Sequence, residues 1–199
     1  MAAAVQGSGR VTTVDHAEAI RSRDPYPTEM FARAGLSESI DLVLVDDSSY
    51  TWWLKGQIEQ NSDSQGNCTP IYDFCYLDGA HNWTIDGFAV VLIEKLLRPG
   101  GWLLLDDLSW TYEGSGAAPT QNAEDLRLSK AEASEPNMQA VFDLIVRQHP
   151  SFAETRIQNG DWGWAKKDPS ADRTFTVTET FDLRTRALGA VRKFRSRVH

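Results

Sequence analysis

The stretch from Ile71 to Tyr112 contains the pattern that decides the fold. It reads I-Y-D-F-C-Y-L-D-G-A-H-N-W over residues 71–83 and L-L-R-P-G-G-W-L-L-L-D-D-L-S-W-T-Y over residues 96–112. Two short apolar runs end in acidic residues, the first at Asp78 and the second at Asp106 and Asp107. Short apolar runs of this kind are typical of strands buried on both faces, as in a parallel sheet.

The segment between the two runs has the spacing of a helix. Its apolar residues are Ile85, Phe88, Ala89, Val91, Leu92, Leu96 and Leu97, and they recur at roughly helical intervals. Residues 98–101, Arg-Pro-Gly-Gly, are expected to stop this helix and turn the chain. In such a strand–helix–strand unit the carboxyl ends of the strands meet at one edge. We therefore expect Asp78, His81, Asp106 and Asp107 to converge there, where open α/β sheets bind ligands.

Three carboxylates and one imidazole at a single sheet edge are candidates for metal chemistry. Carboxylates that lie close together repel one another, so at neutral pH they favour a cation. Oxygen ligands without cysteine suit a hard ion such as Mg²⁺, and His81, three residues past Asp78, can then serve as a general base. The competing interpretation is that Asp106 and Asp107 only cap the next segment and that His81 is a hydrogen-bonded loop residue.

The rest of the chain completes an α/β pattern. β-Branched and apolar runs predict further strands at Val11–Val14 and Ile40–Val45, and a terminal antiparallel hairpin near Phe152–Lys166. The predicted strands of the central unit are Tyr72–Leu77 and Trp102–Leu105. An amphipathic helix is expected over residues 137–149, with Val141, Leu144 and Ile145 facing inward. The predicted fold is a mostly parallel, Rossmann-like sheet flanked by helices.

Two segments lie outside this pattern. Residues 112–136 are rich in Gly, Ala, Ser, Glu and Pro, and this long loop is interpreted either as a lid over a substrate or as an insertion. Residues 1–168 are expected to form one domain, and residues 169–199 a C-terminal extension with a possible strand at 174–180. Its basic run is a solvated helix face or a surface that docks on an acidic partner subunit. The run contains Arg184, Arg186, Arg192, Lys193, Arg195 and Arg197.

Composition limits the classes of function. The chain has 199 residues, 41% hydrophobic and 24% charged, with a net charge of −8. This charge argues against a general nucleic-acid binder, which needs a basic face for phosphates. No run is apolar enough for a membrane span or a signal peptide. Cys75 lies inside a predicted buried strand, so Cys68 and Cys75 are expected to be reduced thiols in a cytoplasmic protein.

The central stretch resembles a known family. Y-D-F-C-Y-L-D-G-A-H followed by L-L-R-P-G-G-W-L-L-L-D-D is similar to the fourth and fifth strands of class I S-adenosylmethionine (SAM) methyltransferases. It is closest to the metal-dependent small-molecule O-methyltransferases, including the macrolide-sugar O-methyltransferases and the cephalosporin-hydroxylase-like group. The resemblance covers roughly residues 9–166. It implies Asp78, Asp106 and Asp107 as metal ligands and His81 as the catalytic base.

The same resemblance suggests which residues hold the cofactor. An acidic residue at the end of the second strand of such folds binds ribose hydroxyls, and Asp15 fits this role unless it is a solvated residue at a strand end. Asp47 and Ser48 follow the predicted strand at Ile40–Val45 and are candidates for the adenine end of SAM. Asp78 is a candidate for both the cofactor site and the metal site.

The sequence before Val11 departs from the family pattern. Residues 6–10 contain two glycines but no preceding apolar strand and no following helix. They are interpreted as a turn out of a helix that ends over residues 1–5. The family's first strand and glycine-rich loop are thus expected to be missing, which makes the chain an N-terminally truncated version of the fold.

These observations favour a SAM-dependent O-methyltransferase acting, with the help of Mg²⁺, on a hydroxyl of a small molecule such as a sugar, polyketide or catechol. The second hypothesis is a truncated or degenerate methyltransferase-fold protein without catalysis. The third, a metal-dependent hydrolase, would need a phosphate-cradling loop or a nucleophile elbow, and neither pattern occurs. Expected partners are a small-molecule substrate and another copy of the chain, and neither nucleic acid nor membrane.

Overall fold

The computed structural model describes residues 9–46, 49–115 and 128–171. Its first part contains the strand β1 (Val11–His16), the short helices α1 (Ala17–Arg21) and α2 (Pro27–Arg33), the strand β2 (Ile40–Val45) and the helix α3 (Tyr50–Gln60). The central part contains β3 (Tyr72–Leu77), α4 (Trp83–Leu96) and β4 (Leu97–Leu105). The last part contains α6 (Lys130–Ser134), α7 (Asn137–Val141), β5 (Phe152–Gln158) and β6 (Trp162–Lys167).

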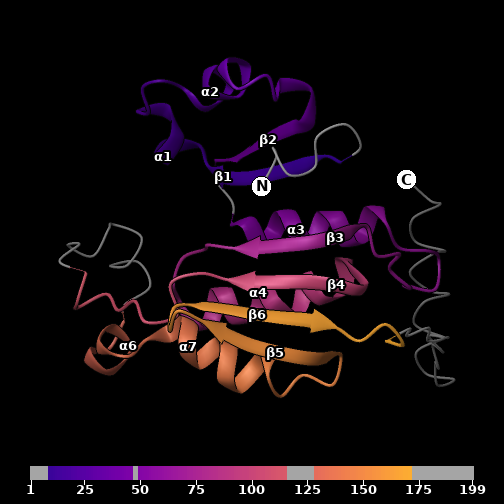
Figure 1. Ribbon diagram of the computed structural model, residues 1–199, viewed down its shortest axis with the longest axis vertical. Coiled ribbons are helices and arrows are strands. Elements are labelled where there is room, and N and C mark those ends of the chain that lie inside the picture. Colours follow the sequence, from indigo (N-terminus) through magenta and orange to yellow (C-terminus); the bar gives the residue numbers. More distant parts are fainter. Residues whose placement is uncertain (1–8, 47–48, 116–127, 172–199) are drawn as a thin grey trace, which may run out of the picture.

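The strands form two hydrogen-bonded sheets (Figure 1). The larger has the order β3-β4-β6-β5, in which β3 and β4 are parallel and β6 is antiparallel to both of its neighbours. The smaller consists of β1 and β2, which are parallel. The predicted α/β architecture with a terminal antiparallel hairpin is confirmed. The hydrogen bonding, however, divides the strands between two sheets.

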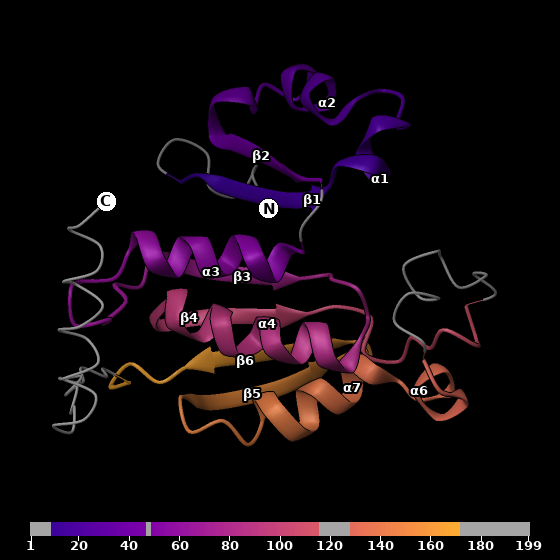
Figure 2. The same cartoon turned by 180° about the vertical axis from the view of Figure 1, so that it is seen from behind.

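One face of the larger sheet carries the core. Seen from behind, α3, α4 and α7 lie across the strands (Figure 2). Leu103 and Leu105 of β4 and Ala165 of β6 are fully buried there, beside Leu96 of α4 and Val141 of α7. Burial of each such aliphatic side chain contributes roughly 1.5–3 kcal/mol. This layer therefore fixes the position of the strand ends that carry the candidate site.

The helix of the central unit differs from the prediction on one face. Ala89, Leu92 and Leu96 are buried as expected, but Phe88 is 54% exposed and Val91 is 38% exposed. The inward face of α4 follows positions 89, 92, 93 and 96, which is the 3.6-residue repeat. Positions 88 and 91 belong to the apolar series of the predicted helix but lie on its other side.

The predicted stop of this helix is confirmed, because α4 ends at Leu96, but the predicted turn is wrong. β4 begins at Leu97, directly after α4, and residues 98–101 already belong to the strand. The register between β3 and β4 is irregular here, because Tyr72 pairs with Leu97 whereas Phe74 pairs with Trp102. The Pro-Gly-Gly sequence is thus accommodated as an irregularity at the start of the strand.

The helix predicted over residues 137–149 changes its winding midway. α7 ends at Val141, and residues 142–146 form a π-helical turn in which the Arg147 amide donates to the Phe142 carbonyl at 2.9 Å. The extra residue in a π turn rotates the following side chains relative to an α-helix. Val141 faces the core as predicted, whereas Leu144 is 57% exposed, which corrects its predicted inward position.

A buried lysine connects the last strand to the central helix. Lys167, at the end of β6, donates from Nζ to the backbone carbonyls of Glu94 and Leu97, the latter at 2.8 Å. Its Nζ also lies 3.2 Å from Glu94 Oε1. These carbonyls are at the carboxyl end of α4, where a cation is favourable. β6 therefore supplies the cap of α4.

Several predictions concern residues that the structure does not describe. These are the helix end at residues 1–5, the strand at 174–180 and the basic run beyond it.

Within the described part of the predicted loop 112–136 there is the short helix α6, which begins with a capping box formed by Ser129 and Glu132. Cys68 and Cys75 are free thiols. Across the described residues, no helix has the length and hydropathy needed to cross a membrane.

Candidate active site

The candidate site lies where β3 and β4 end. Leu77 pairs with Leu105 in the parallel register, so the residues that follow them leave the sheet side by side. The Asp106 amide donates to the Leu77 carbonyl at 3.1 Å, which holds the two strand ends together. The loop after β3 carries Asp78 and His81, and the loop after β4 carries Asp107. The expected convergence of these residues is therefore present in the structure.

Asp78, His81 and Asp107 form one compact group. His81 Nε2 lies 3.0 Å from Asp107 Oδ2 and 3.8 Å from Asp78 Oδ1. One ligand atom from each residue lies within 4.8 Å of the others, which is close enough for a single ion. The His81 side chain is only 17% exposed, whereas the two carboxylates are 49% and 41% exposed. The imidazole is thus held in place while the acidic groups remain accessible.

The pKa of Asp78 is raised by the surroundings of its carboxyl group. Partial burial raises the pKa of its carboxyl above the ordinary value. The neighbouring His81 lowers it, and the negative charges of Asp106, Asp107 and Asp15 raise it further. Asp15 therefore lies near enough to influence this edge, although it belongs to the other sheet. An accumulation of negative charge that raises a carboxyl pKa is what a bound cation would relieve.

Both members of the closest pair have an uncommon backbone conformation. His81 and Asp107 each have φ of 54°, in the left-handed region that few residues other than glycine adopt. Non-glycine residues in this region occur preferentially at functional sites, where the surrounding structure holds them. The observation supports a functional interpretation of the two loops, independently of the charges.

Asp106 has different partners from its neighbour. It accepts a hydrogen bond from the Tyr76 hydroxyl, and its Oδ1 accepts the Asp107 amide at 2.8 Å. Asp106, Asp107 and Asp161 form a second group whose ligand atoms lie within 4.8 Å of one another. The predicted set of Asp78, Asp106 and Asp107 is thus arranged as two overlapping groups that share Asp107.

Asp161 belongs to the turn between β5 and β6. Its Oδ1 accepts hydrogen bonds from the amide and the hydroxyl of Ser109, at 3.0 Å and 2.7 Å. Its backbone carbonyl accepts the Leu108 amide at 2.9 Å. The terminal hairpin therefore fixes the loop that carries Asp107, and hydrogen bonding to Ser109 lowers the pKa of Asp161.

A buried carboxylate organises the loop that carries the histidine. Asp86, in the first turn of α4, is 0% exposed and accepts hydrogen bonds from the Tyr50 hydroxyl and from the amides of Ala80 and Asn82. Burial raises its pKa, and these hydrogen bonds act in the opposite direction. The Tyr112 hydroxyl donates to the Ala80 carbonyl at 2.5 Å. The backbone on both sides of His81 is consequently fixed.

Aromatic rings enclose the imidazole on one side. The His81 and Trp110 rings are 4.7 Å apart between centroids, and Trp110 contacts Tyr112 edge-to-face at 4.6 Å. Trp110 follows closely after Asp107 in the same loop, and its amide donates to the Asp107 carbonyl at 3.1 Å. The packing fixes the ring plane of the candidate base.

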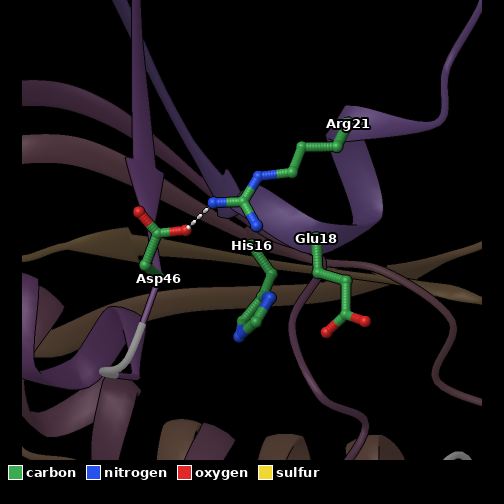
Figure 3. Close-up of a pocket in the computed structure, with 4 residues that line it drawn as sticks. All are labelled: His16, Glu18, Arg21 and Asp46. Carbon is green, nitrogen blue, oxygen red and sulfur yellow. Dashed lines mark hydrogen bonds and ion pairs between the residues drawn. The ribbon is translucent and has the colours of Figure 1, made fainter.

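The ends of β1 and β2 border a separate, polar cavity. It has a volume of about 360 Å³ and is lined by His16, Glu18, Arg21 and Asp46, as Figure 3 shows. Arg21 of α1 donates to Asp46 at 2.7 Å and joins the ends of the two elements. Asp15 belongs to β1 itself and accepts the His16 amide at 2.7 Å. The predicted ribose ligand, Asp15, is therefore the residue before His16 and is not itself part of the cavity lining, while Asp47 and Ser48 fall outside the described residues.

Sequence reasoning missed several residues of this site. Asp86 had a detectable signal, because an acidic residue stands in the apolar series of a predicted helix one turn after the D-G-A-H motif. Asp161 follows Asn159 and Gly160 between the two strands of the predicted hairpin, but its proximity to Asp107 depends on the pairing of β6 with β4. Tyr50 and Tyr112 come from distant segments, and nothing in the sequence connects them with Ala80.

The comparisons with known proteins support the fold. No family model matches the sequence, and no curated protein matches it. An O-methyltransferase from Bacillus cereus, solved in complex with SAH, is similar in structure with a TM-score of 0.53 and 16% identity. The O-methyltransferase TomG from Streptomyces achromogenes, involved in tomaymycin synthesis and solved with SAM, is similar with a TM-score of 0.50 and 14% identity. Both matches cover 84% of this chain and 66% of the solved chain.

These similarities define the class of fold. The chain has the Rossmann-like fold of the SAM-dependent O-methyltransferases, as its central stretch suggested. It spans about two thirds of the length of these solved structures. At this level of identity the likeness establishes the fold alone.

Proposed function

We propose that the protein is a SAM-dependent O-methyltransferase that acts on a hydroxyl group of a small molecule with the help of Mg²⁺. The observation that supports this most directly is the group formed by Asp78, His81 and Asp107 at the carboxyl edge of the parallel strands. A paired imidazole and several carboxylates are suited to remove a proton from a hydroxyl group. In open α/β folds of this kind, a nucleotide-like cofactor binds at the neighbouring strand ends.

The donor chemistry of the site fits Mg²⁺. Asp78, Asp106, Asp107 and Asp161 offer carboxylate oxygens, which this hard ion prefers. The raised pKa of Asp78, caused by burial and by the nearby negative charges, is consistent with a place for a cation. When bound, Mg²⁺ lowers the pKa of a coordinated hydroxyl, and SAM supplies an electrophilic methyl group on its sulfonium.

The pair of His81 and Asp107 is suited to handle the proton. With Nε2–H donating to Asp107 Oδ2 across the 3.0 Å contact, Nδ1 of the same ring is the atom that accepts a proton from the substrate hydroxyl. The carboxylate holds this tautomer and stabilises the imidazolium that forms. Trp110 keeps the ring in plane, and Asp86 holds the backbone beneath it. The chain thereby orients the base before the substrate arrives.

The cofactor would be held at the ends of β1, β2 and β3. Asp15 is proposed to accept the ribose hydroxyls, with Asp78 facing the reacting end and Asp47 and Ser48 near the adenine. The cavity lined by His16, Glu18, Arg21 and Asp46 begins one residue after Asp15 in the sequence. Asp15→Ala is expected to weaken SAM binding by roughly 1.5–3 kcal/mol, as for a charged hydrogen bond. A dissociation constant equal to that of the unaltered protein would remove Asp15 from the site.

Calorimetric titration with SAM, with and without Mg²⁺, tests the proposal. We expect heat of binding from SAM in the unaltered protein and no turnover in His81→Ala, which should retain both ligands. Glu29→Ala, on the exposed surface of α2, is the matched control and should behave like the unaltered protein. Absence of SAM binding at millimolar concentration would favour the second hypothesis, a methyltransferase-fold protein without catalysis. Heat from Mg²⁺ in a protein that does not bind SAM would instead favour the hydrolase hypothesis.

A further inference from the structure

The four-stranded sheet carries a cluster of aromatic residues on the face opposite the core. The parallel and antiparallel registers place Phe74, Trp102 and Lys166 in one row across β3, β4 and β6. The next row on the same face contains Tyr76, Leu104, Trp164 and Arg156. Residues two apart along a strand share a face, so these rows lie on one surface. We call this surface, with Trp162, the aromatic face.

The side chains of the aromatic face contact one another. The Trp102 and Trp164 rings meet edge-to-face with centroids 6.2 Å apart, and Phe74 lies 6.2 Å from Trp164. The Arg156 guanidinium lies 5.2 Å from the Trp164 ring and 5.7 Å from the Trp102 ring. Such contacts make an ordered platform of large apolar area.

The aromatic face is open within the part of the chain that the structure describes. In Figure 1 the four strands lie in front, and none of the described helices crosses them on this side. Tyr76 is 43% exposed and Trp162 is 40% exposed, whereas Phe74, Trp102 and Trp164 are half-buried and Leu104 between them is buried. Sheets that contain parallel strands are ordinarily covered on both faces, and contiguous exposed apolar surface of this kind marks a docking site.

We propose that residues 172–199 of the same chain dock on the aromatic face and cover it. The described chain leaves the sheet at the end of β6, the strand that carries Trp164 and Lys166. The 28 residues that follow Ala171 therefore begin beside this face, and no long connection is needed to reach it. The proposal does not depend on the chemistry of the candidate active site.

The sequence of the segment suits this role. Leu188, Val191, Phe194 and Val198 recur at intervals of three or four residues, which is the pattern of an amphipathic helix. Arg186, Lys193, Ser196 and Arg197 fall on the opposite side of the same helix, whereas Arg184 and Arg195 fall beside the apolar residues. A helix with this pattern would place its apolar side on the aromatic rings and its basic side in water.

The net charge of residues 1–171 favours docking within the chain, whereas the aromatic face itself carries Arg156 and Lys166. Residues 172–199 contain seven Lys or Arg and three Asp or Glu, which gives +4, whereas the whole chain carries −8. The remaining 171 residues therefore carry −12. Opposite net charges on two parts of one chain attract, and covalent connection gives the segment a high effective concentration at the face.

Site-specific photo-cross-linking tests the proposal in the full chain. Phe194, on the apolar side of the segment, is replaced by p-benzoylphenylalanine, and the matched control carries the same group at Ser196, on the basic side. We expect the label at position 194 to form cross-links within one chain to the peptides that contain Trp102 or Trp164. The label at position 196 should give several-fold fewer. Equal yields from the two positions, or cross-links to other peptides only, would overturn the proposal.

Mixing isotopically light and heavy protein distinguishes one chain from two. Cross-links that join light and heavy chains at the aromatic face would show that a second copy covers it, and the proposal would be wrong. A second measurement uses Phe194→Asp and Ser196→Asp, which add the same charge on opposite sides. Only Phe194→Asp should shift the indole NMR signals of Trp102 and Trp164, assigned with Trp102→Phe and Trp164→Phe. Identical spectra for the two variants would contradict docking by this side of the segment.

Discussion

The two sheets of the molecule differ in how much apolar surface they bury. In the four-stranded sheet, Leu77, Leu103, Leu105 and Ala165 belong to one continuous core with α4 and α7. In the two-stranded sheet, β1 has no fully buried residue, and among the residues that the structure describes, none of positions 9–46 belongs to that core. The smaller sheet thus has only a few buried apolar residues beside it, namely Ala17, Ile20 and Val45, in addition to the backbone pairing between β1 and β2.

The proposed catalytic residue and the proposed ribose-binding residue therefore belong to sheets that differ in their buried core. The candidate base and metal ligands lie on the strands with the deeper core, whereas Asp15 and the polar cavity lie on the strands with little core. Regions with few buried apolar contacts open at lower free energy than the global unfolding. We therefore expect the proposed cofactor side to be the less stable part, and to gain more order when a ligand binds.

The largest expected effect comes from a core truncation. Phe142 is 1% exposed and packs against Gly163 of β6, so Phe142→Ala should reduce the free energy of unfolding by about 3–5 kcal/mol. Val14→Ala in β1 should cost only about 1 kcal/mol. Urea denaturation measures both. If the two substitutions cost the same, the contrast between the two sheets would be wrong.

The next largest loss of unfolding free energy is expected from removing the buried carboxylate of Asp86. Asp86→Ala leaves the Tyr50 hydroxyl and two amides without their acceptor, and each unpaired buried group costs roughly 1–3 kcal/mol. We expect a loss of at least about 2 kcal/mol in thermal or urea unfolding. Glu29→Ala is the exposed control and should be nearly neutral. A neutral Asp86→Ala would show that the loop around His81 is held by other contacts.

A divalent ion should stabilise the larger sheet specifically. With Mg²⁺ or Mn²⁺ at 100 times its dissociation constant, the expected gain in unfolding free energy is about 2.7 kcal/mol. Asp107→Asn should remove most of this gain because both acidic groups contain Asp107, and Asp78→Asn and Asp106→Asn should each remove part of it. Asp73→Asn, an exposed residue paired with Arg98, is the control. Melting temperatures measured with and without the ion test this prediction. If the ion raised the melting temperature of Asp107→Asn as much as that of the unaltered protein, a shared ion would be excluded.

The smallest effect concerns the pH dependence of stability without metal. The pKa of Asp78 is raised in the folded protein above its ordinary value of 3.8, so the folded state binds more protons than the unfolded state just above that pH. This group therefore lowers stability as pH rises through that range. Asp78→Asn should be slightly more stable than the unaltered protein at pH 7, and the advantage should vanish below about pH 3.8. A constant difference across this range would contradict a raised pKa.

Local sequence patterns predicted most of the elements because each strand of this sheet is a short apolar run with a clear end. The positions of β2 and β3 agree with the runs at residues 40–45 and 72–77. The errors arose where tertiary packing overrides local preference. Residues 98–101 have the composition of a turn, but pairing with β3 makes them strand. Leu144 fits the helical period, but it lies within the π turn of residues 142–146 and is exposed.

The candidate site was predicted in part for the same reason. Parallel topology is enough to bring Asp78, His81 and Asp107 together, because all three follow strand ends. The grouping of Asp106 with Asp161 depends on β6 lying next to β4, which is a long-range pairing that no local pattern reveals. The support that Asp86 gives to the histidine loop depends on its burial, which becomes visible only when α3 and α4 pack together.

The strand order has a consequence for the nascent chain. β6 lies between β4 and β5, so the ribosome completes β4 at Leu105 long before it produces the strand that covers its free edge, which begins at Trp162. At about 5–20 residues per second, this interval lasts roughly 3–11 seconds. During that time an apolar strand is open to pairing with other chains. Translation speed and chaperone access between these two points should therefore govern how much protein reaches the native state.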